Sequence, residues 1–264
     1  MTACSRTPSE PPVGRAARRF RGRRTHRLVA TTQLVVVAAA GLCLLLTGCT
    51  VAATGRPAAA PDLGRWQPPP ILTPRLGDLL LSAGDVNSVG HTRGMTLRTP
   101  IAKMGHAEDL VSNPSCLDAY SPIQAAAYQG SNWTAVQGQI LDDAASPADP
   151  IKHALVQALV AFRDADSAQQ YFGQAKPRWS ACANRPLTVN RPGRSPVRWT
   201  FGDLAATDST LSILQTEEGG GGFACHRAMG LANNVIIDAL WCGTDTSNQA
   251  GQVVGKIAAA ISQA

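Results

Sequence analysis

Excess charge of one sign is missing from most of this sequence. The chain has 264 residues and a formal net charge of +6, from 24 basic and 18 acidic side chains. Eight arginines and a single acid lie within residues 1–48, which leaves 16 basic and 17 acidic groups for the remainder. The basicity therefore belongs to the N-terminal segment, and we expect no nucleic acid partner for the rest of the chain.

The sequence also lacks the motifs of common catalytic and metal sites. It contains no G-x-S-x-G nucleophile elbow, and no cysteines stand at the close spacing of zinc sites. Asp142 and Asp143 are adjacent on an expected strand, so they should point to opposite faces. We predict no catalytic residue, no metal and no cofactor. The histidines after residue 50 are interpreted as ordinary surface or sheet residues: His91, His106, His153 and His226.

Long hydrophobic runs are absent apart from one, at residues 28–46. It follows an arginine-rich segment and ends in Leu-Thr-Gly-Cys at Cys49. This tetrad resembles a bacterial lipobox, in which the cysteine is diacylated and becomes the mature N-terminus. We therefore predict a signal peptide at residues 1–48 and a lipid on Cys49. The alternative is an uncleaved transmembrane helix, which the 19-residue length of the run also permits.

The remainder divides into a spacer and a domain. Residues 49–75 carry six prolines and little apolar periodicity, a composition typical of an extended tether. Residues 76–264 contain the periodic apolar segments and form one expected domain. Ser82 is a candidate N-cap for a short helix at its start, and residues 118–129 also read as helical.

The best predicted helix spans residues 166–182. Its apolar side chains recur every three or four positions, and Asp166 is placed to cap it. Pro177 predicts a kink, or a break near Ala175. Strands joined by short turns follow, and a last helix is expected over residues 248–262. The sequence predicts an α+β fold, an antiparallel sheet with helices packed mainly on one face.

Cysteine usage fits an exported chain with two disulfides. Asn233-Asn234 favours a two-residue hairpin turn, and Cys225 and Cys242 lie equally far from it on the two strands. Facing cysteines of such a hairpin come within disulfide reach, and the other two cysteines then form the second pair. Four cysteines follow the lipobox, an even number: Cys116, Cys182, Cys225 and Cys242.

Several segments together resemble a known family. The order "LLLSAGDVNSVG", "WTAVQGQIL", a helix ending in Trp-Ser-Ala-Cys, and "FACHRAMGLANNVIIDALWCG" is similar to the extracellular sensor domain of mycobacterial serine/threonine protein kinase H. The resemblance covers about residues 76–264. It implies an α+β domain with two disulfides and a ligand-holding cleft, and the family includes free-standing lipoproteins. No Gly-rich loop, V-A-I-K or H-R-D motif is present, so a kinase domain is not expected.

These observations predict a non-catalytic, sensor-like ligand-binding domain held to the extracytoplasmic face of the membrane by lipid. The expected partners are the membrane, a small-molecule or cell-wall ligand, and a receptor kinase. The residues that would bind the ligand stay unassigned. Two alternatives remain open: a hydrolase of envelope material, and a structural or partner-docking envelope lipoprotein.

Overall fold

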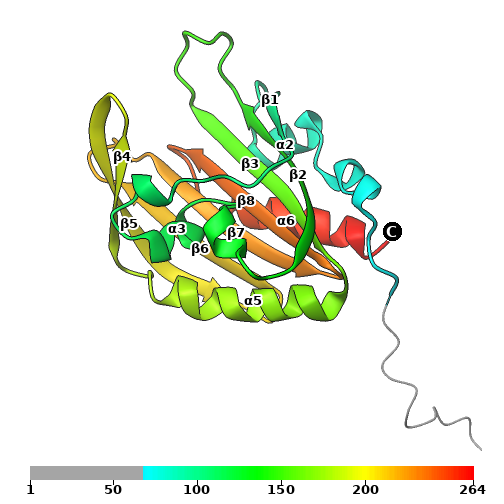
Figure 1. The fold of residues 1–264 in the computed structure, drawn as a ribbon. Coiled ribbons are helices and arrows are strands. Elements are labelled where there is room, and N and C mark those ends of the chain that lie inside the picture. The colour runs from blue at the N-terminus through cyan, green and yellow to red at the C-terminus, as the bar shows by residue number, and fades with distance from the viewer. Residues whose placement is uncertain (1–67) are drawn as a thin grey trace, which may run out of the picture. The chain divides into compact units, whose positions relative to one another are not determined.

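A computed structural model describes residues 68–264, so the predicted signal peptide and the predicted lipid site at Cys49 lie outside the described part. A single antiparallel sheet dominates it (Figure 1). Its strands run in the order β1-β2-β3-β8-β7-β6-β5-β4. They are β1 (Thr96–Ile101), β2 (Trp133–Asp142), β3 (His153–Phe162), β4 (Pro186–Arg191), β5 (Arg194–Ala206), β6 (Thr210–Glu217), β7 (Ala224–Ala232) and β8 (Val235–Gly243).

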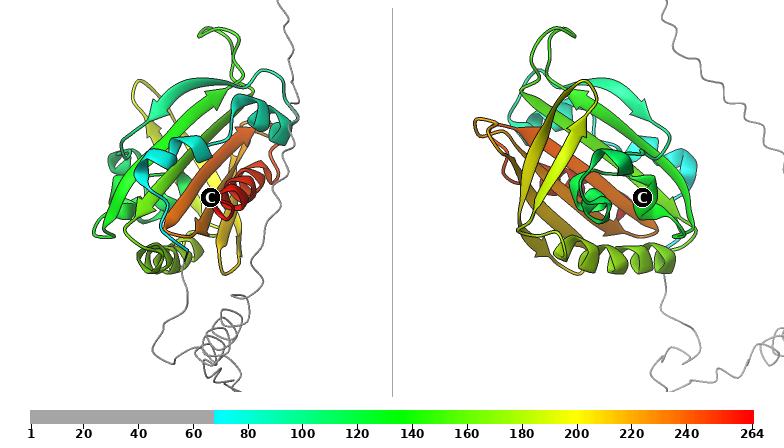
Figure 2. Two further views of the ribbon diagram at one scale, coloured as in Figure 1. Left: turned by 90° about the vertical axis from the view of Figure 1, so that its right-hand side faces the viewer. Right: turned by 60° about the vertical axis from the view of Figure 1, so that its left-hand side comes forward.

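The helices divide between the two faces of this sheet. The fold contains α2 (Ala83–Gly90), α3 (Leu117–Tyr120), α4 (Ala125–Tyr128), α5 (Ala165–Ser180), α6 (Gln249–Ile261) and four 3-10 turns, η1 (Thr73–Arg75), η2 (Gly77–Leu79), η3 (Glu108–Leu110) and η4 (Pro114–Cys116). Figure 2 shows α5 and α6 on opposite sides of the central strands. No helix in residues 68–264 is long and apolar enough to cross a membrane.

The α+β prediction is confirmed, but the helices are shared between both faces instead of lying mainly on one. The reason is visible in the central strands, where β3 and β8 are buried along almost their whole length. A strand with apolar residues at successive positions needs cover on both sides. One core cluster accordingly lies under α5 and contains Phe162, Phe172 and Trp179. The other lies under α2 and α6 and contains Trp241 and Ile257.

Helix α5 begins earlier than expected and passes through its proline. Asp164, not Asp166, caps it by accepting a hydrogen bond from the Ser167 backbone N–H at 2.8 Å. Pro177 lies inside the helix without breaking it. The burial of Trp179 and the disulfide at Cys182 hold the last turn in place, which offsets the backbone hydrogen bond that proline removes.

Two short helices replace the single one expected over residues 118–129. Helices α3 and α4 are separated by residues 121–124, where Ile123 takes a left-handed φ of 48°. At the start of the domain, Ser82 caps α2 as predicted and forms a reciprocal capping box with Asp85. The stretch before α2, part of the predicted spacer, is joined to the β7–β8 turn by a hydrogen bond from the Ile71 N–H to Asn234.

Candidate functional site

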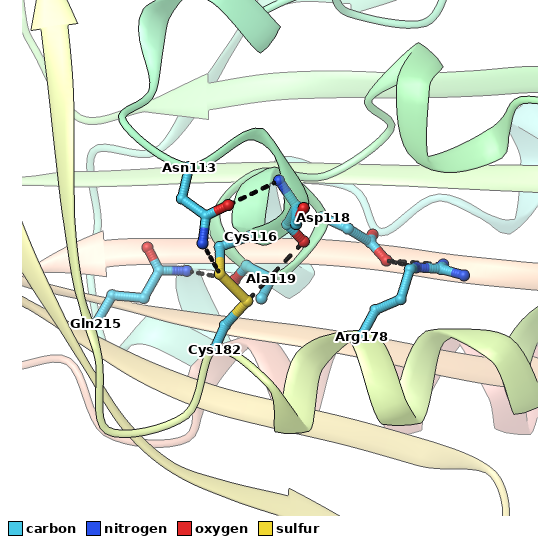
Figure 3. Close-up of a disulfide and its surroundings, with 8 residues drawn as sticks. Asn113, Cys116, Asp118, Ala119, Arg178, Cys182 and Gln215 are labelled. Carbon is cyan, nitrogen blue, oxygen red and sulfur yellow. Dashed lines mark hydrogen bonds and ion pairs between the residues drawn. A yellow bond between two sulfur atoms is a disulfide. The ribbon is translucent and has the colours of Figure 1, made fainter.

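Both disulfides lie on the α5 face of the sheet. Cys225 and Cys242 are cross-strand partners of β7 and β8, with their Cα atoms 4.0 Å apart. Cys116 and Cys182 join η4 to the end of α5, with a Cα separation of 5.7 Å (Figure 3). Both pairings agree with the spacing argument. Each bond links segments that the α5 face brings together, so the disulfides restrain this side of the molecule.

A buried ion pair lies beside them on the same face. The Arg227 guanidinium contacts the Asp238 carboxylate at 2.5 Å, and both side chains are completely buried. Arg227 also donates to the backbone carbonyls of Ala228 and Ala239, and stacks over the Trp179 ring at 4.8 Å. An arginine inside a core is tolerated because its charge is paired and most of its donors are satisfied.

Asp238 also fixes the segment that carries α3 and α4. One of its oxygens accepts hydrogen bonds from the Ile123 N–H at 2.9 Å and from the Tyr128 hydroxyl at 2.8 Å. A positive φ at a β-branched residue such as Ile123 is strained by about 1–3 kcal/mol, and it persists only where the surroundings enforce it. The carboxylate of Asp238 supplies that restraint from the centre of the sheet.

Further bonds hold the same segment at its other end. The Gln215 side-chain amide donates to the carbonyls of Ala119 and Tyr120, at 2.9 and 3.0 Å, and Arg178 pairs with Asp118 at 2.9 Å (Figure 3). Burial raises the pKa of the Asp118 carboxyl above its usual value, although the charge of Arg178 draws it back. The α3–α4 segment is thus tied to the sheet, to α5 and to a disulfide.

A polar cavity of about 620 Å³ opens at the far end of the β2–β3 hairpin. Its walls come from the α2–β1 connection, which contributes His91 and Arg93, and from the hairpin, which contributes Asp143, Asp149 and Lys152. This volume lies in the range of small-molecule sites. Ionisable side chains contribute much of its lining, whereas Arg75 is the single charged side chain that lines the apolar cavity near residue 68, so the polar cavity is the candidate ligand site.

His153 forms one wall of this polar cavity and lies between two carboxylates. Its Nδ1 is 2.7 Å from Asp143 Oδ2, and its Nε2 is 3.0 Å from Asp245 Oδ1. Burial alone would raise the pKa of Asp143, but hydrogen bonds from the backbone and ring of His153 and from the Lys152 N–H lower it below its usual value.

The sequence predicts His153 to be an ordinary strand residue, and this cluster shows that it is more. The register of the β2–β3 hairpin places Asp143 beside it, and the turn after β8 adds Asp245. The two neighbouring aspartates do diverge as expected, since Asp142 contacts Arg98 instead. Half of the cluster could have been predicted, because a hairpin formed by the two expected strands brings Asp143 towards His153. Asp245 is 92 positions away from the histidine, and no local pattern points to it.

The remaining predicted residues are spread over the surface and core. His91 has a left-handed φ of 53° at the end of α2, and His106 is exposed near Glu108. His226 is buried opposite Trp241, as the hairpin register predicts. Burial, followed by the charge of Arg227, lowers the pKa of His226 to about 4. Within residues 68–264, no three or more His, Cys, Asp or Glu side chains are arranged so that they could hold a metal ion.

This domain is similar to the extracellular parts of known mycobacterial kinases. A model of the PknH-like extracellular domain matches residues 73–260. Serine/threonine-protein kinase PknH of Mycobacterium tuberculosis H37Rv is 38% identical over 192 residues, which are 72% of this chain and 30% of the kinase. Serine/threonine-protein kinase PknJ of the same organism is 27% identical over 188 residues, 70% of this chain and 30% of that kinase. The chain thus spans about a third of the length of these curated relatives.

A solved structure agrees in fold. The crystal structure of the extracellular domain of PknH from Mycobacterium tuberculosis superposes with a TM-score of 0.70 at 35% sequence identity, covering 74% of this chain and 99% of that one. Residues 73–260, which the family model matches, include the whole sheet of this chain, its two disulfides and the residues that line its polar cavity. This chain belongs to the family of PknH-like extracellular domains.

Proposed function

We propose that this protein is a lipid-anchored, extracytoplasmic sensor-like domain that binds a small or wall-derived ligand and catalyses no reaction. Membership of a family named for the extracellular part of a kinase supports the extracytoplasmic placement. Two disulfides support it as well, since such bonds persist in oxidising compartments. The lipobox at Cys49 supports the anchor.

The polar cavity beside His153 is the observation that carries the ligand-binding part of the proposal. Arg93 and Lys152 line it, and their side chains form no hydrogen bond or ion pair with any other described residue. The Asp143 oxygens, in contrast, already accept bonds from His153 and the Lys152 N–H. Free cationic donors therefore face the cavity beside one further carboxylate, Asp149. This combination suits a polar ligand that carries an acidic group and hydroxyl or amide donors.

Thermal shift and calorimetric titration with muropeptides and envelope extracts test ligand binding. We expect a stabilising shift for the wild-type domain and its loss in an Arg93→Ala, Lys152→Ala double variant. A matched control exchanges exposed residues elsewhere, Arg194→Ala with Lys176→Ala, and should bind like the wild type. Binding that is unaffected by the cavity variant, or no shift with any fraction, would refute this site.

Metabolic labelling tests the anchor separately. Cells fed an alkyne analogue of palmitate should label the wild-type protein, and a Cys49→Ala variant should lose the label. Cys43→Ala is the matched control, because Cys43 lies within the predicted signal peptide and should not affect acylation. Label that persists in the Cys49→Ala variant would contradict the proposed anchor.

An envelope hydrolase is the second candidate, and the contact between His153 and Asp143 on a cavity wall is the one feature that favours it. Against it, Asp245 already contacts the other ring nitrogen. Thr92 has the single hydroxyl among the cavity's lining side chains, and that hydroxyl donates to Asn87. Turnover of a chromogenic ester or muropeptide that disappears in His153→Gln would favour the hydrolase and oppose the non-catalytic reading.

A further inference from the structure

A second cavity, of about 720 Å³, opens where the described chain begins. Its walls are residues 68–72 and Arg75, the β7–β8 turn at residues 232–233, and residues 261–264 at the end of α6. We call it the entry groove. It lies at the opposite end of β3 from the polar cavity, because Asn234 bonds to Phe162 at one end of the strand, whereas His153 begins the other. The two cavities are therefore independent sites.

The walls of the entry groove are fixed by hydrogen bonds from the two asparagines of the turn. Asn233, which has a left-handed φ of 52°, donates its side-chain amide to the Pro69 carbonyl at 2.7 Å. Asn234 accepts from the Ile71 N–H at 2.7 Å and donates to the Ile71 carbonyl at 3.2 Å. The turn that reverses the β7–β8 hairpin thus also holds the first described residues, and the groove is preformed.

The lining of the entry groove is predominantly apolar. Three prolines, Ile71, Leu72 and Ile261 are among its lining residues, and Leu72 is 66% exposed. A preformed, mostly apolar hollow is typical of a ligand site. Arg75 is the single charged side chain in the lining. Its contact with Asp78, at 3.6 Å between exposed groups, is weak enough to leave the guanidinium accessible.

This chemistry fits a ligand with a long apolar tail and an anionic head. We infer that the entry groove binds an acyl chain of an anionic bilayer lipid, with Arg75 facing the headgroup. The position along the chain supports this occupant, and here the inference rests on the proposed anchor. Pro68 follows Cys49 by 19 positions, a stretch that reaches at most about 65 Å. Acyl chains are then the apolar ligands at the highest effective concentration.

A fluorescent fatty acid, cis-parinaric acid, tests the groove without any anchor. The related extracellular domain crystallised by itself, so residues 50–264 are a suitable soluble form. We expect Leu72→Asp to weaken binding at least about tenfold, since it places a charge on the apolar rim. The matched control is Leu97→Asp, on β1, where the leucine is 53% exposed and lines neither cavity. This control should bind like the wild type.

Vesicles test the headgroup. The wild-type domain should bind phosphatidylglycerol vesicles more strongly than phosphatidylcholine vesicles, and Arg75→Gln should remove most of that preference, with Arg163→Gln as the exposed control. Absence of fatty-acid binding, or equal losses in the Leu72→Asp and Leu97→Asp variants, would overturn the inference. So would binding that appears only after Trp66→Ala, which would identify the chain's own preceding segment as the occupant. None of these three results affects the outcome of the polar-cavity or palmitate experiments.

Discussion

The two faces of the sheet are built on the same strands but from different chemistry. Along β8, Ile237 and Trp241 point into the cluster under α6. Asp238 and Cys242, each one position further along, point to the α5 face. The α6 face is thus stabilised mainly by apolar packing, and the α5 face adds a buried ion pair and two disulfides. The free energy gained by apolar packing is roughly proportional to the buried area and has no preferred direction, whereas ion pairs and disulfides form only in a specific geometry.

Specific contacts on the α5 face hold its irregular segment in one arrangement. The α3–α4 segment has little regular structure of its own, yet it is held by Asp238, by Gln215 and by the Cys116–Cys182 bond. Such restraints are needed for a strained connection such as the one at Ile123. Helix α6 needs none of them, because an amphipathic helix on an apolar sheet face is oriented by its own stripe.

The largest effect is expected from Asp238→Ala on the α5 face. The change leaves Arg227 buried without a counter-charge and removes the hydrogen-bond acceptor for the Ile123 N–H and the Tyr128 hydroxyl. The free energy of unfolding should therefore fall by about 5 kcal/mol or more. Urea denaturation measures the loss. Glu218→Ala removes an exposed partner of Arg198 and should change stability by less than about 1 kcal/mol. Equal losses in the two variants would erase the distinction between a buried and a surface ion pair.

Removal of the Cys116–Cys182 bond should have the next largest effect. A Cys116→Ala, Cys182→Ala variant frees a loop with a separation of 66 residues, and the chain-entropy model gives a loss of about 4 kcal/mol. The same change at Cys225 and Cys242, whose separation is 17, should lose about 3 kcal/mol. Denaturant midpoints compare the two variants. A larger loss for the shorter loop would show that local packing, not loop length, decides their ranking.

The buried His226 should make stability depend on pH. Its folded pKa of about 4 lies below the usual 6.5, so between these values the unfolded chain takes up a proton that the folded protein refuses. Stability should therefore fall by up to roughly 3 kcal/mol as the pH drops from above 6.5 to about 4. Urea titrations at several pH values should show a shallower fall in His226→Gln, with the exposed His106→Gln as control. Asp118, whose pKa is raised, contributes in the opposite direction at the acidic end.

The smallest effect concerns packing on the α6 face. A methyl group at Gly230 would lie 2.3 Å from Val254, so Gly230→Ala should destabilise by about 1–3 kcal/mol. Gly255, on α6 itself, has open space around its Cβ position, and Gly255→Ala should stabilise by up to about 1 kcal/mol. Thermal midpoints of the two variants should shift in opposite directions. Shifts of the same sign would mean that the face is packed less closely than the structure indicates.

Local patterns were enough for much of the fold. The period of two along β7 and β8, read outward from Asn233-Asn234, placed Cys225 opposite Cys242 and His226 opposite Trp241. The stripe of α5 and the final helix followed from periodicity. The break within residues 118–129 could not be read in the same way, because it depends on Asp238, more than a hundred positions away. The helix propensities of residues 118–129 contain no information about such a distant partner.

Most of each candidate site could not be predicted from local sequence patterns. The polar cavity forms where residues 91–94 meet the tip of the β2–β3 hairpin, and one of the two carboxylates that contact His153 is Asp245, from beyond β8. The entry groove likewise joins both ends of the described chain to the β7–β8 turn. One local feature does predict a buried polar contact, namely the aspartate in the middle of the apolar run "NVIIDALWC", because a buried acid requires a partner.

We propose that this domain lies outside the cytosol, is oxidised and is anchored by lipid. Intact-mass and peptide mass spectrometry of the protein isolated from its native membrane tests this proposal. We expect a mature chain that begins at an acylated Cys49, with Cys116 linked to Cys182 and Cys225 linked to Cys242. Free thiols at these four positions, or a chain that retains residues 1–48, would refute the proposal.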